Sequence, residues 1–300
     1  MIYLTGDIHG DVTRLEAAAL QRRGIAIRKE DTILVCGDFE IPWGDGKRAE
    51  DEARLARLSR LPYRVLFIDG NHENYTLLKK YPVSTFAGAR VQRLLPNVMH
   101  VLRGEILTLE GQTFFCLGGA ASTDRNHLTQ GLSWWPEEEI SPDEKRRALE
   151  NAAQAKWHVD YVVTHTAPQA WKEKAFGSVP GDDCETARFL DILAGRLHYQ
   201  RWFFGHFHWN HYTKESRAAW LFSDVVTPDL GRCGTLPAEY VRQQLPDTLR
   251  MLAEAEETDR EKLHQAIVKA NREEKIPLEI AMWLYRRFNI CRPKNFLEDV

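Results

Sequence analysis

An aspartate and a histidine two residues apart follow the first apolar run of the chain, and they have the side chains of a metal site. The run covers residues 2–5, and Asp7 and His9 come shortly after it. Residues two apart on an extended backbone point to the same side, so this carboxylate and this imidazole can meet at one point. Gly6 and Gly10 allow sharp bends on either side of the pair. The two ligand types suit a borderline divalent cation and supply half of a site for it.

Four further apolar runs end in polar residues of similar kinds. Their motifs are Gly37-Asp38, Gly70-Asn71-His72-Glu73, Thr164-His165 and Gly205-His206-Phe207-His208. Open α/β sheets bind ligands outside the carboxyl ends of their strands. If the strands are parallel, these side chains therefore converge at one edge of the sheet.

The collected side chains have more oxygen and imidazole ligands than one metal ion needs, and about enough for two. The set comprises Asp7, His9, Asp38, Asn71, His72, His165, His206 and His208. It contains no thiolate, which disfavours a structural zinc site. Taken singly, each residue is better explained by turn capping or by core hydrogen bonding. Their occurrence together at strand ends favours ligation.

Short apolar runs that alternate with helical patterns indicate a parallel sheet covered on both faces. The patterns predict helices over residues 12–23, 48–60, 141–157 and 184–196, the last capped by Asp182 or Asp183. They predict buried strands over residues 32–36, 64–68, 160–164 and 201–204, with 220–223 as the last strand. Glycine-containing turns separate three more runs and predict an antiparallel meander over 98–102, 105–109 and 113–117.

Length and composition favour a cytoplasmic globular protein. The 300 residues can bury a full core, and the net charge of −3 gives no broad basic surface. The sequence shows no signal peptide and no membrane-spanning run. The five cysteines are far apart, so we expect a reducing compartment without disulfides. We expect a domain over residues 1–235 and a helical appendage over residues 236–300, where the character of the sequence changes.

The five motifs occur in the order found in calcineurin-like metallophosphoesterases, and the sequence resembles that family over residues 1–223. The combination of Asn71-His72-Glu73 with His206-Phe207-His208 makes the resemblance specific. The last motifs also resemble those of a bacterial and prophage subgroup. The resemblance implies a four-layer α/β/β/α sandwich of two mixed sheets, followed here by the C-terminal helical extension.

The resemblance further implies a site for two divalent metal ions. The implied ligands are Asp7, His9 and His208 for one ion and Asn71, His165 and His206 for the other, with Asp38 bridging both. Mn, Fe, Zn and Ni suit these ligands, and we expect Mn to support activity. A hydroxide between ions held about 3.5–4 Å apart would attack phosphorus in line with the leaving oxygen. His72 would protonate the leaving alkoxide.

The chain departs in one motif from the phosphoprotein phosphatases of this family. In those enzymes an aspartate orients the catalytic histidine and an arginine binds phosphate. Here Ile41 stands where that aspartate would be. Glu40 and Asp69 are the candidates to replace it.

The segment over residues 118–135 is longer and more aromatic than a minimal family core. Arg125 and His127 are candidate substrate-binding residues that would contact phosphate, and the alternative is an ordinary solvated loop. For Trp134 and Trp135 we expect loop packing rather than a platform for bases. The other histidines lack the strand-end context, and we expect most of them not to be metal ligands: His100, His127, His158, His198, His211 and His264.

The function implied is hydrolysis of a phosphomonoester or phosphodiester at a two-metal site. Nucleotide hydrolysis, of dinucleoside polyphosphates or cyclic nucleotides, and nuclease activity are alternatives. The acidic net charge argues against duplex DNA. The non-enzymatic alternative is a metal-binding scaffold for protein interactions, which is disfavoured because no ligand is missing. We expect a small phosphate ester as the substrate and no membrane partner, with self-association through the C-terminal helices as an open role of the appendage.

Overall fold

The chain divides into two compact units, Met1–Gly234 and Thr235–Val300. We describe them from a computed structural model. The residues it describes are 1–44, 46–123, 125–177, 184–212, 217–255, 259–273, 275–288 and 290. None of the helices in this part of the chain has the length and hydrophobicity needed to cross a membrane.

The first sheet of unit 1 has eight strands in the order β13-β12-β1-β2-β3-β6-β5-β4. Its strands are β1 (Ile2–Thr5), β2 (Thr32–Val35), β3 (Arg64–Phe67), β4 (Val83–Phe86), β5 (Ala89–Leu95), β6 (Val98–Val101), β12 (Val225–Val226) and β13 (Cys233–Gly234). The central strands β1, β2, β3 and β6 are parallel, as the buried apolar runs predict. The outer strands pair antiparallel, so the sheet is mixed.

The second sheet has five strands in the order β11-β10-β9-β8-β7. Its strands are β7 (Glu105–Leu109), β8 (Gln112–Leu117), β9 (Tyr161–Thr164), β10 (Arg201–Phe204) and β11 (Ala218–Trp220). Strands β8 to β11 are parallel and β7 is antiparallel to β8, so this sheet is mixed as well. The carboxyl ends of β9 and β10 therefore lie at the same edge of the sheet.

Hydrophobic clusters on both faces of each sheet define the layers of unit 1. Leu4 and Phe114, from different sheets, belong to one cluster and place the sheets face to face. Tyr3, next to Leu4, belongs to the cluster that contains Leu20 of α1 (Ala17–Arg22) and Leu58 of α2 (Arg48–Leu58). Neighbouring residues of a strand therefore belong to clusters on opposite faces of the sheet, because successive side chains of a strand point to opposite sides.

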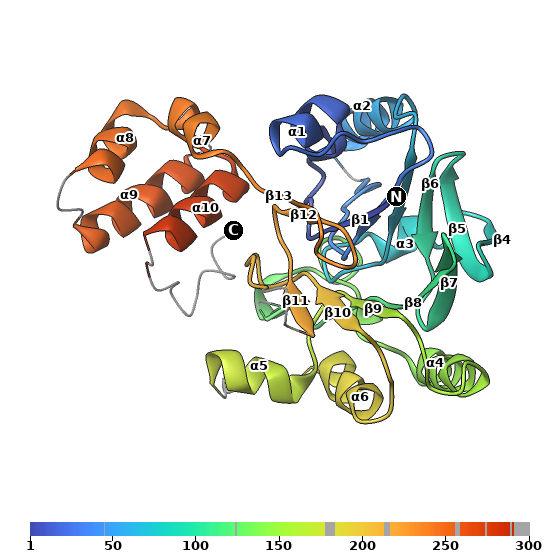
Figure 1. Cartoon of the computed structure of the whole chain (residues 1–300). Helices are drawn as coiled ribbons and strands as arrows, with labels where there is room; N and C mark the ends of the chain where they lie inside the picture. The colour runs from blue at the N-terminus through green and yellow to red at the C-terminus, as the bar shows by residue number, and fades with distance from the viewer. Residues whose placement is uncertain are drawn as a thin grey trace. The chain divides into compact units, whose positions relative to one another are not determined.

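The outer face of the second sheet carries the third cluster. Phe115, next to Phe114, packs there with residues of α4 (Pro142–Gln154) and α6 (Glu185–Ala194), and α5 (Gln169–Phe176) covers the same face. Figure 1 shows α4, α5 and α6 beside the second sheet and α1 and α2 beside the first. The prediction of a four-layer α/β/β/α sandwich with two mixed sheets is confirmed.

The predicted meander over residues 98–117 is wrong. Strand β6 belongs to the first sheet, whereas β7 and β8 form a hairpin in the second sheet. The chain changes sheet at a turn in which Arg103 is buried and Gly104 has a φ of 77°. An alternation of apolar and polar residues reports the two faces of a strand and not the sheet that the strand joins. The turn could therefore be predicted, but the change of sheet could not.

Two predicted helices end or break earlier than expected. The helix over residues 12–23 consists of a 3₁₀ turn, Val12–Leu15, and α1, because the backbone of Glu16 between them is extended, with a ψ of 147°. The helix expected to reach residue 157 ends at Gln154, and Lys156 and Trp157 have φ angles of 53° and 61°. Neither break has a glycine or proline to mark it in the sequence.

Three further details differ from prediction. The N-cap of α6 is Cys184, whose Sγ accepts from the amide of Ala187 at 3.4 Å, while Asp182 and Asp183 lie outside the described residues. The strand expected over 220–223 is β11, which ends at Trp220 and is followed by β12 and β13. The short helix α3 (Tyr75–Leu78), α5 and strands β4 and β5 were not predicted.

Unit 2 is helical, as predicted for the C-terminal extension. Its helices are α7 (Ala238–Gln244), α8 (Asp247–Glu254), α9 (Arg260–Arg272) and α10 (Leu278–Arg287). Leu263, Ile267 and Ala270 recur at helical spacing on α9 and are buried, so the leucine and alanine pattern of this segment marks a packed face.

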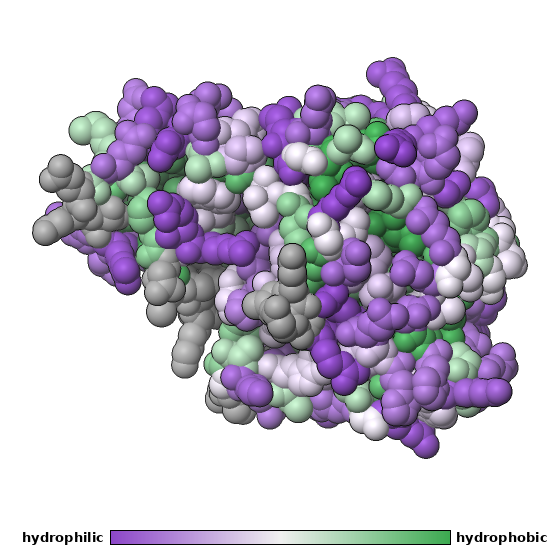
Figure 2. Space-filling view, in the orientation of Figure 1, coloured by the Kyte–Doolittle hydropathy of each residue, from purple (hydrophilic) through white to green (hydrophobic). Residues whose placement is uncertain are grey.

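On the face of the protein in Figure 2, hydrophilic residues are widespread and hydrophobic residues form small groups between them.

Four cysteines lie in the described residues, and all of them are free thiols. Cys36, Cys116 and Cys184 are buried and Cys233 is exposed. Burial raises the pKa of the Cys36 and Cys116 thiols, which keeps them protonated in the core. Cys291 lies outside the described residues.

Candidate metal centre

The five predicted strand ends meet at one place, where the two sheets come together. Asp7, Asp38 and Asn71 follow β1, β2 and β3 of the first sheet, and His165 and His206 follow β9 and β10 of the second. Backbone contacts join the two groups: the amide of His206 donates to both carboxylate oxygens of Asp7, at 2.9 and 3.0 Å. The strand ends that carry the candidate ligands therefore converge within each sheet, as parallel strands require. The ends from the two sheets also meet each other.

One group of candidate ligands contains Asp7, His9, Asp38 and His208, whose ligand atoms all lie within 4.8 Å of one another. The Nε2 atoms of His9 and His208 face each other at 2.7 Å. The Nε2 atom of His208 lies 3.1 Å from Oδ2 of Asp7. Two imidazoles and two carboxylates thus point at one small volume, which is the donor set that the sequence predicts for one ion.

The second group contains Asp38, His165 and His206, again with all ligand atoms within 4.8 Å. The Nε2 atom of His165 lies 3.2 Å from Oδ1 of Asp38 and 3.0 Å from Oδ1 of Asn71. Asp38 belongs to both groups, with Oδ1 near His165 and Oδ2 4.0 Å from His9. Its position is the one expected for a carboxylate that bridges two ions.

The surroundings of these side chains fit a metal centre. The Nδ1 atom of His165 lies 2.8 Å from the carbonyl oxygen of Cys36, so Nδ1 donates there and Nε2 is the ring nitrogen that faces the cluster. A Cβ atom on Gly70 would collide with Oδ1 of Asp38, and one on Gly205 would collide with Oδ1 of Asp7. Glycine at these two positions leaves room for carboxylates that face the centre.

The backbone at the site is also unusual. His9, Asp38, His206 and His208 have φ angles of 46°, 47°, 68° and 46°. Non-glycine residues seldom adopt this left-handed region, and such conformations cluster at functional sites. Glu40, with a φ of 57°, belongs to the same group. These left-handed residues occur together because their side chains must turn inward directly after a strand.

The charges at the site favour cations. Burial lowers the pKa of His165, but Asp38 and Asp7 outweigh it and raise the pKa to about 9. Burial likewise lowers the pKa of His9, and Glu40, Asp38 and Asp7 raise it to about 9. For Asp38 burial raises the pKa, yet the neighbouring histidines hold it well below its usual range. The carboxylates therefore stay ionised, and protons on His9 and His165 balance them in the metal-free protein, whereas burial holds the pKa of His206 well below its usual range.

Metal binding is accordingly expected to release protons. A histidine that ligates a metal ion must be neutral, and at pH 7 both His9 and His165 are positively charged because each has a pKa of about 9. Loading the metal-free protein at pH 7 should release about two protons, and apparent affinity should rise as the pH is raised toward 9. Calorimetry with Mn²⁺ in two buffers of different ionisation enthalpy measures the number released. Equal heats in both buffers would contradict this prediction.

The predicted catalytic histidine, His72, lies at the rim of the metal centre with 36% of its side chain exposed. Its ring contacts the ring of His9 edge-on, with centroids 5.6 Å apart, and its amide donates to Oδ1 of Asp38 at 2.9 Å. Nδ1 of His72 is 4.0 Å from Oε1 of Glu40, which also lies 2.7 Å from Nδ1 of His9. Glu40 is thus the carboxylate next to His72.

Asp69, the other candidate to orient His72, has different partners. Its Oδ1 lies 2.9 Å from Nε2 of His100, and its Oδ2 accepts from Nε of Arg103 at 2.7 Å and from Tyr75 at 3.1 Å. These contacts occupy both oxygens of a side chain that is 1% exposed. The structure therefore gives Asp69 a structural role and leaves Glu40 beside the histidine.

The candidate substrate contacts, Arg125 and His127, lie in the segment between β8 and α4. Arg125 and His127 form a 3₁₀ turn and are exposed, and the contact of Arg125 within the described residues is with Glu139 at 3.9 Å. Trp135 is buried, donates to Thr76 at 2.9 Å and packs against another tryptophan, as expected for loop packing. The phosphate contacts of Arg125 and His127 remain a prediction.

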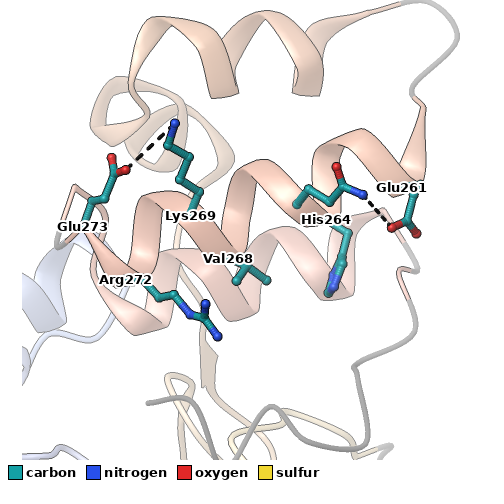
Figure 3. A pocket seen from close by; sticks show the side chains of 7 residues that line it. Glu261, His264, Val268, Lys269, Arg272 and Glu273 are labelled. Carbon is teal, nitrogen blue, oxygen red and sulfur yellow. Dashed lines mark hydrogen bonds and ion pairs between the residues drawn. The ribbon is translucent and has the colours of Figure 1, made fainter.

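A pocket lies on α9 in unit 2, and its lining differs from the candidate metal centre (Figure 3). It is lined by Glu261, His264, Gln265, Val268, Lys269, Arg272 and Glu273. Gln265 donates to Glu261 at 3.0 Å, and Lys269 pairs with Glu273 at 3.9 Å, so several of its polar groups are satisfied within the helix. The candidate metal clusters found among the described residues both lie in unit 1.

Sequence reasoning missed residues that support the ligand loops. Glu73 is fully buried and accepts from the amides of Phe39 and Glu40 at 2.7 and 3.0 Å, which shapes the turn after Asp38. Arg14 is buried and donates to the carbonyl oxygens of Asp7 and Phe222. The residue types gave no signal of these roles, because the partners are backbone atoms of distant segments.

Unit 1 is thus a four-layer sandwich with two clusters of acidic residues and histidines at the carboxyl ends of its strands. A family model described as calcineurin-like phosphoesterase matches residues 1–210. The chain belongs to the calcineurin-like phosphoesterase family. The resemblance recognised in the sequence motifs is confirmed.

More distant similarities add no detail. A putative 5'-nucleotidase from Staphylococcus aureus, solved in complex with alpha-ketoglutarate, is 14% identical with a TM-score of 0.40; the match covers 75% of this chain and 50% of that one. Phosphopantetheinyl hydrolase from Mycobacterium tuberculosis is 14% identical with a TM-score of 0.39 and coverages of 74% and 87%. The chain thus spans about half the length of the nucleotidase. No curated protein matches the chain.

Proposed function

We propose that this protein hydrolyses a phosphomonoester or phosphodiester with two divalent metal ions bound at the strand ends of unit 1. The observation that carries the proposal is the pair of ligand clusters that share Asp38. Membership of the calcineurin-like phosphoesterase family supports the reaction class.

The donor set fits two divalent ions. Asp7, His9 and His208 would hold one ion, and Asn71, His165 and His206 the other, with Asp38 between them. Two ions at such a centre supply an activated water and stabilise the charge that develops on the phosphoryl group. Oxygen and imidazole donors without thiolate suit Mn, Fe, Zn or Ni, and Mn is the ion that we propose to support activity.

The side chains around the centre have separable tasks. His72 is half-exposed at the rim, where a leaving-group oxygen could reach it, and its backbone is held by the hydrogen bond to Asp38. It can donate a proton to that oxygen. Glu40 bonds to His9 at 2.7 Å and lies 4.0 Å from His72, so one carboxylate adjoins both imidazoles. We assign Glu40 as the residue that holds the His9 ring in place and places a negative charge beside His72.

The scaffold alternative receives less support from the structure. A fold that had become a pure interaction module would no longer need the ligands, yet all seven candidate ligands surround one centre. The buried carboxylates Asp7 and Asp38, 0% and 1% exposed, are costly to keep in a core without a cation. Their burial favours bound cations, and membership of the phosphoesterase family favours an enzyme over a metal-binding scaffold.

The proposal is tested by removing and restoring metal. Chelator-stripped protein should be inactive toward nitrophenyl phosphate and bis-nitrophenyl phosphate, and Mn²⁺ should restore hydrolysis of at least one of them. The same panel with Zn²⁺, Ni²⁺ and Fe²⁺ ranks the metals, and the ratio of the two rates separates monoester from diester preference. Stripped protein that hydrolyses both esters at the untreated rate, or protein that stays inactive with every metal, would show the proposed function to be wrong.

A further inference from the structure

The amide of Asn71 is held at both of its ends. Its Oδ1 lies 3.0 Å from Nε2 of His165, and its Nδ2 donates to Oγ of Ser122 at 3.2 Å. Asn71 and Ser122 are 6% and 4% exposed, so water does not readily replace either contact. An asparagine can present its oxygen or its nitrogen, and only the oxygen can ligate a metal ion. The acceptor at Ser122 therefore decides which atom faces the metal centre.

Ser122 can accept from Asn71 only if its own proton points elsewhere, and Glu138 provides that acceptor. The Ser122 amide donates to Oε2 of the Glu138 carboxyl at 3.2 Å, and the Ser122 hydroxyl lies close enough to the same carboxyl to lower its pKa. Glu138 is 1% exposed. Burial raises its pKa to about 8, and the bonds from Ser122 only partly offset this. The carboxyl is therefore mostly uncharged at pH 7, and an amide side chain could replace it.

A buried arginine anchors the segment that carries Glu138. Arg103 donates to the carbonyl oxygens of Glu137, Glu138 and Glu139, at 2.7, 3.2 and 2.9 Å. It also donates from Nε to Oδ2 of Asp69, two residues before Asn71, at 2.7 Å. The same guanidinium thus ties the β3 end and the Glu138 segment together. Hydrogen bonds close the path from Asn71 through Ser122 and Glu138 back to the start of its own loop.

We propose that Ser122 and Glu138 are positioning residues that hold the amide oxygen of Asn71 toward a divalent metal ion in the cluster of Asp38, His165 and His206. The proposal rests on the proposed function and assigns a task to the long segment after β8. Partners of this kind fix the orientation of a ligand, and their loss costs about 10–100-fold in metal affinity or activity. Because Asn71 belongs to one cluster, the loss should fall on one of the two sites.

The test is a titration of chelator-stripped protein with Mn²⁺ and with Zn²⁺, followed by calorimetry. Ser122→Ala and Glu138→Ala should each weaken one site about 10–100-fold and leave the other near its wild-type affinity. Glu138→Gln, which keeps an acceptor oxygen and the shape of the uncharged carboxyl, should restore affinity to near the wild-type value. Melting of each metal-free variant checks that it is folded.

Two matched controls come from the same segment. Ser133 accepts from the amide of Thr129 at 2.9 Å, and Glu137 pairs with Lys79 at the surface. Ser133→Ala and Glu137→Gln should leave both sites unchanged.

The outcomes separate this proposal from the proposed function. Two wild-type sites that persist unchanged in Ser122→Ala and Glu138→Ala would overturn the positioning role and leave the metal centre standing. Equal weakening of both sites, or failure of Glu138→Gln to recover affinity in a folded protein, would also overturn it. If the wild-type protein binds neither Mn²⁺ nor Zn²⁺, both proposals are wrong.

Discussion

Asp38→Asn is expected to abolish binding of both metal ions and to lower phosphoesterase activity by more than about 10³-fold, since removing even one charge-stabilising donor costs about 10²–10³-fold. The substitution keeps the shape of the side chain and removes its charge. Asp38 is 1% exposed and is shared by both ligand clusters. It also raises the pKa of His9 and His165, so its loss weakens the negative field that attracts cations to both sides of the centre.

Metal content after dialysis and the rate with a nitrophenyl ester measure this effect. Asp31→Asn is the matched control because Asp31 is also buried and precedes the same strand, β2, that Asp38 follows. Asp31 accepts from the amino terminus at 2.7 Å and from the amide of Arg28 at 2.7 Å, and neither of these partners is a candidate ligand. The control should keep its metals. An Asp38→Asn protein that retains two ions and full activity would show that the Asp38 carboxylate is not a ligand shared by both ions.

His72→Ala is expected to lower kcat by about 10²–10⁴-fold with an alkyl phosphate ester while leaving metal content unchanged. The side chain is at the rim of the centre, is not in either ligand cluster and has 36% of its surface exposed. An alkoxide is a poor leaving group unless it is protonated, so the loss of the acid should slow hydrolysis of the alkyl ester. A nitrophenolate leaves without protonation, and the variant should lose much less activity with that ester.

The ratio of the two losses distinguishes an acid from a residue that only shapes the site. His158→Ala serves as the control, because His158 is exposed and stacks on His198, with centroids 4.5 Å apart, rather than on a candidate ligand. It should hydrolyse both esters at the wild-type rate. Equal losses of His72→Ala with both esters, or an unaffected rate with the alkyl ester, would remove His72 from the acid role.

Much of the fold followed from local patterns. The parallel strands β1, β2 and β3 are short, continuous apolar runs bounded by Gly-Asp or Gly-Asn turns, and burial on both faces is what produces such runs. The order of residues could not show that β6 and β7 join different sheets, because Leu102, Arg103 and Gly104 form an ordinary turn in sequence. Nor did it show β4, which has no buried residue, or β5, whose burial alternates irregularly.

The candidate ligands themselves were determined by the sequence alone, since each is a carboxylate, amide or imidazole placed directly after a buried strand. What supports them was decided only by tertiary structure. Ser122 lies 51 residues from Asn71 along the chain, and the sheets must pack before the two can meet. Asp69 and Glu40 were equal candidates in sequence, and their partners in space separated them. Ligand identity depends on local spacing, whereas ligand orientation depends on contacts between segments that only the folded core brings together.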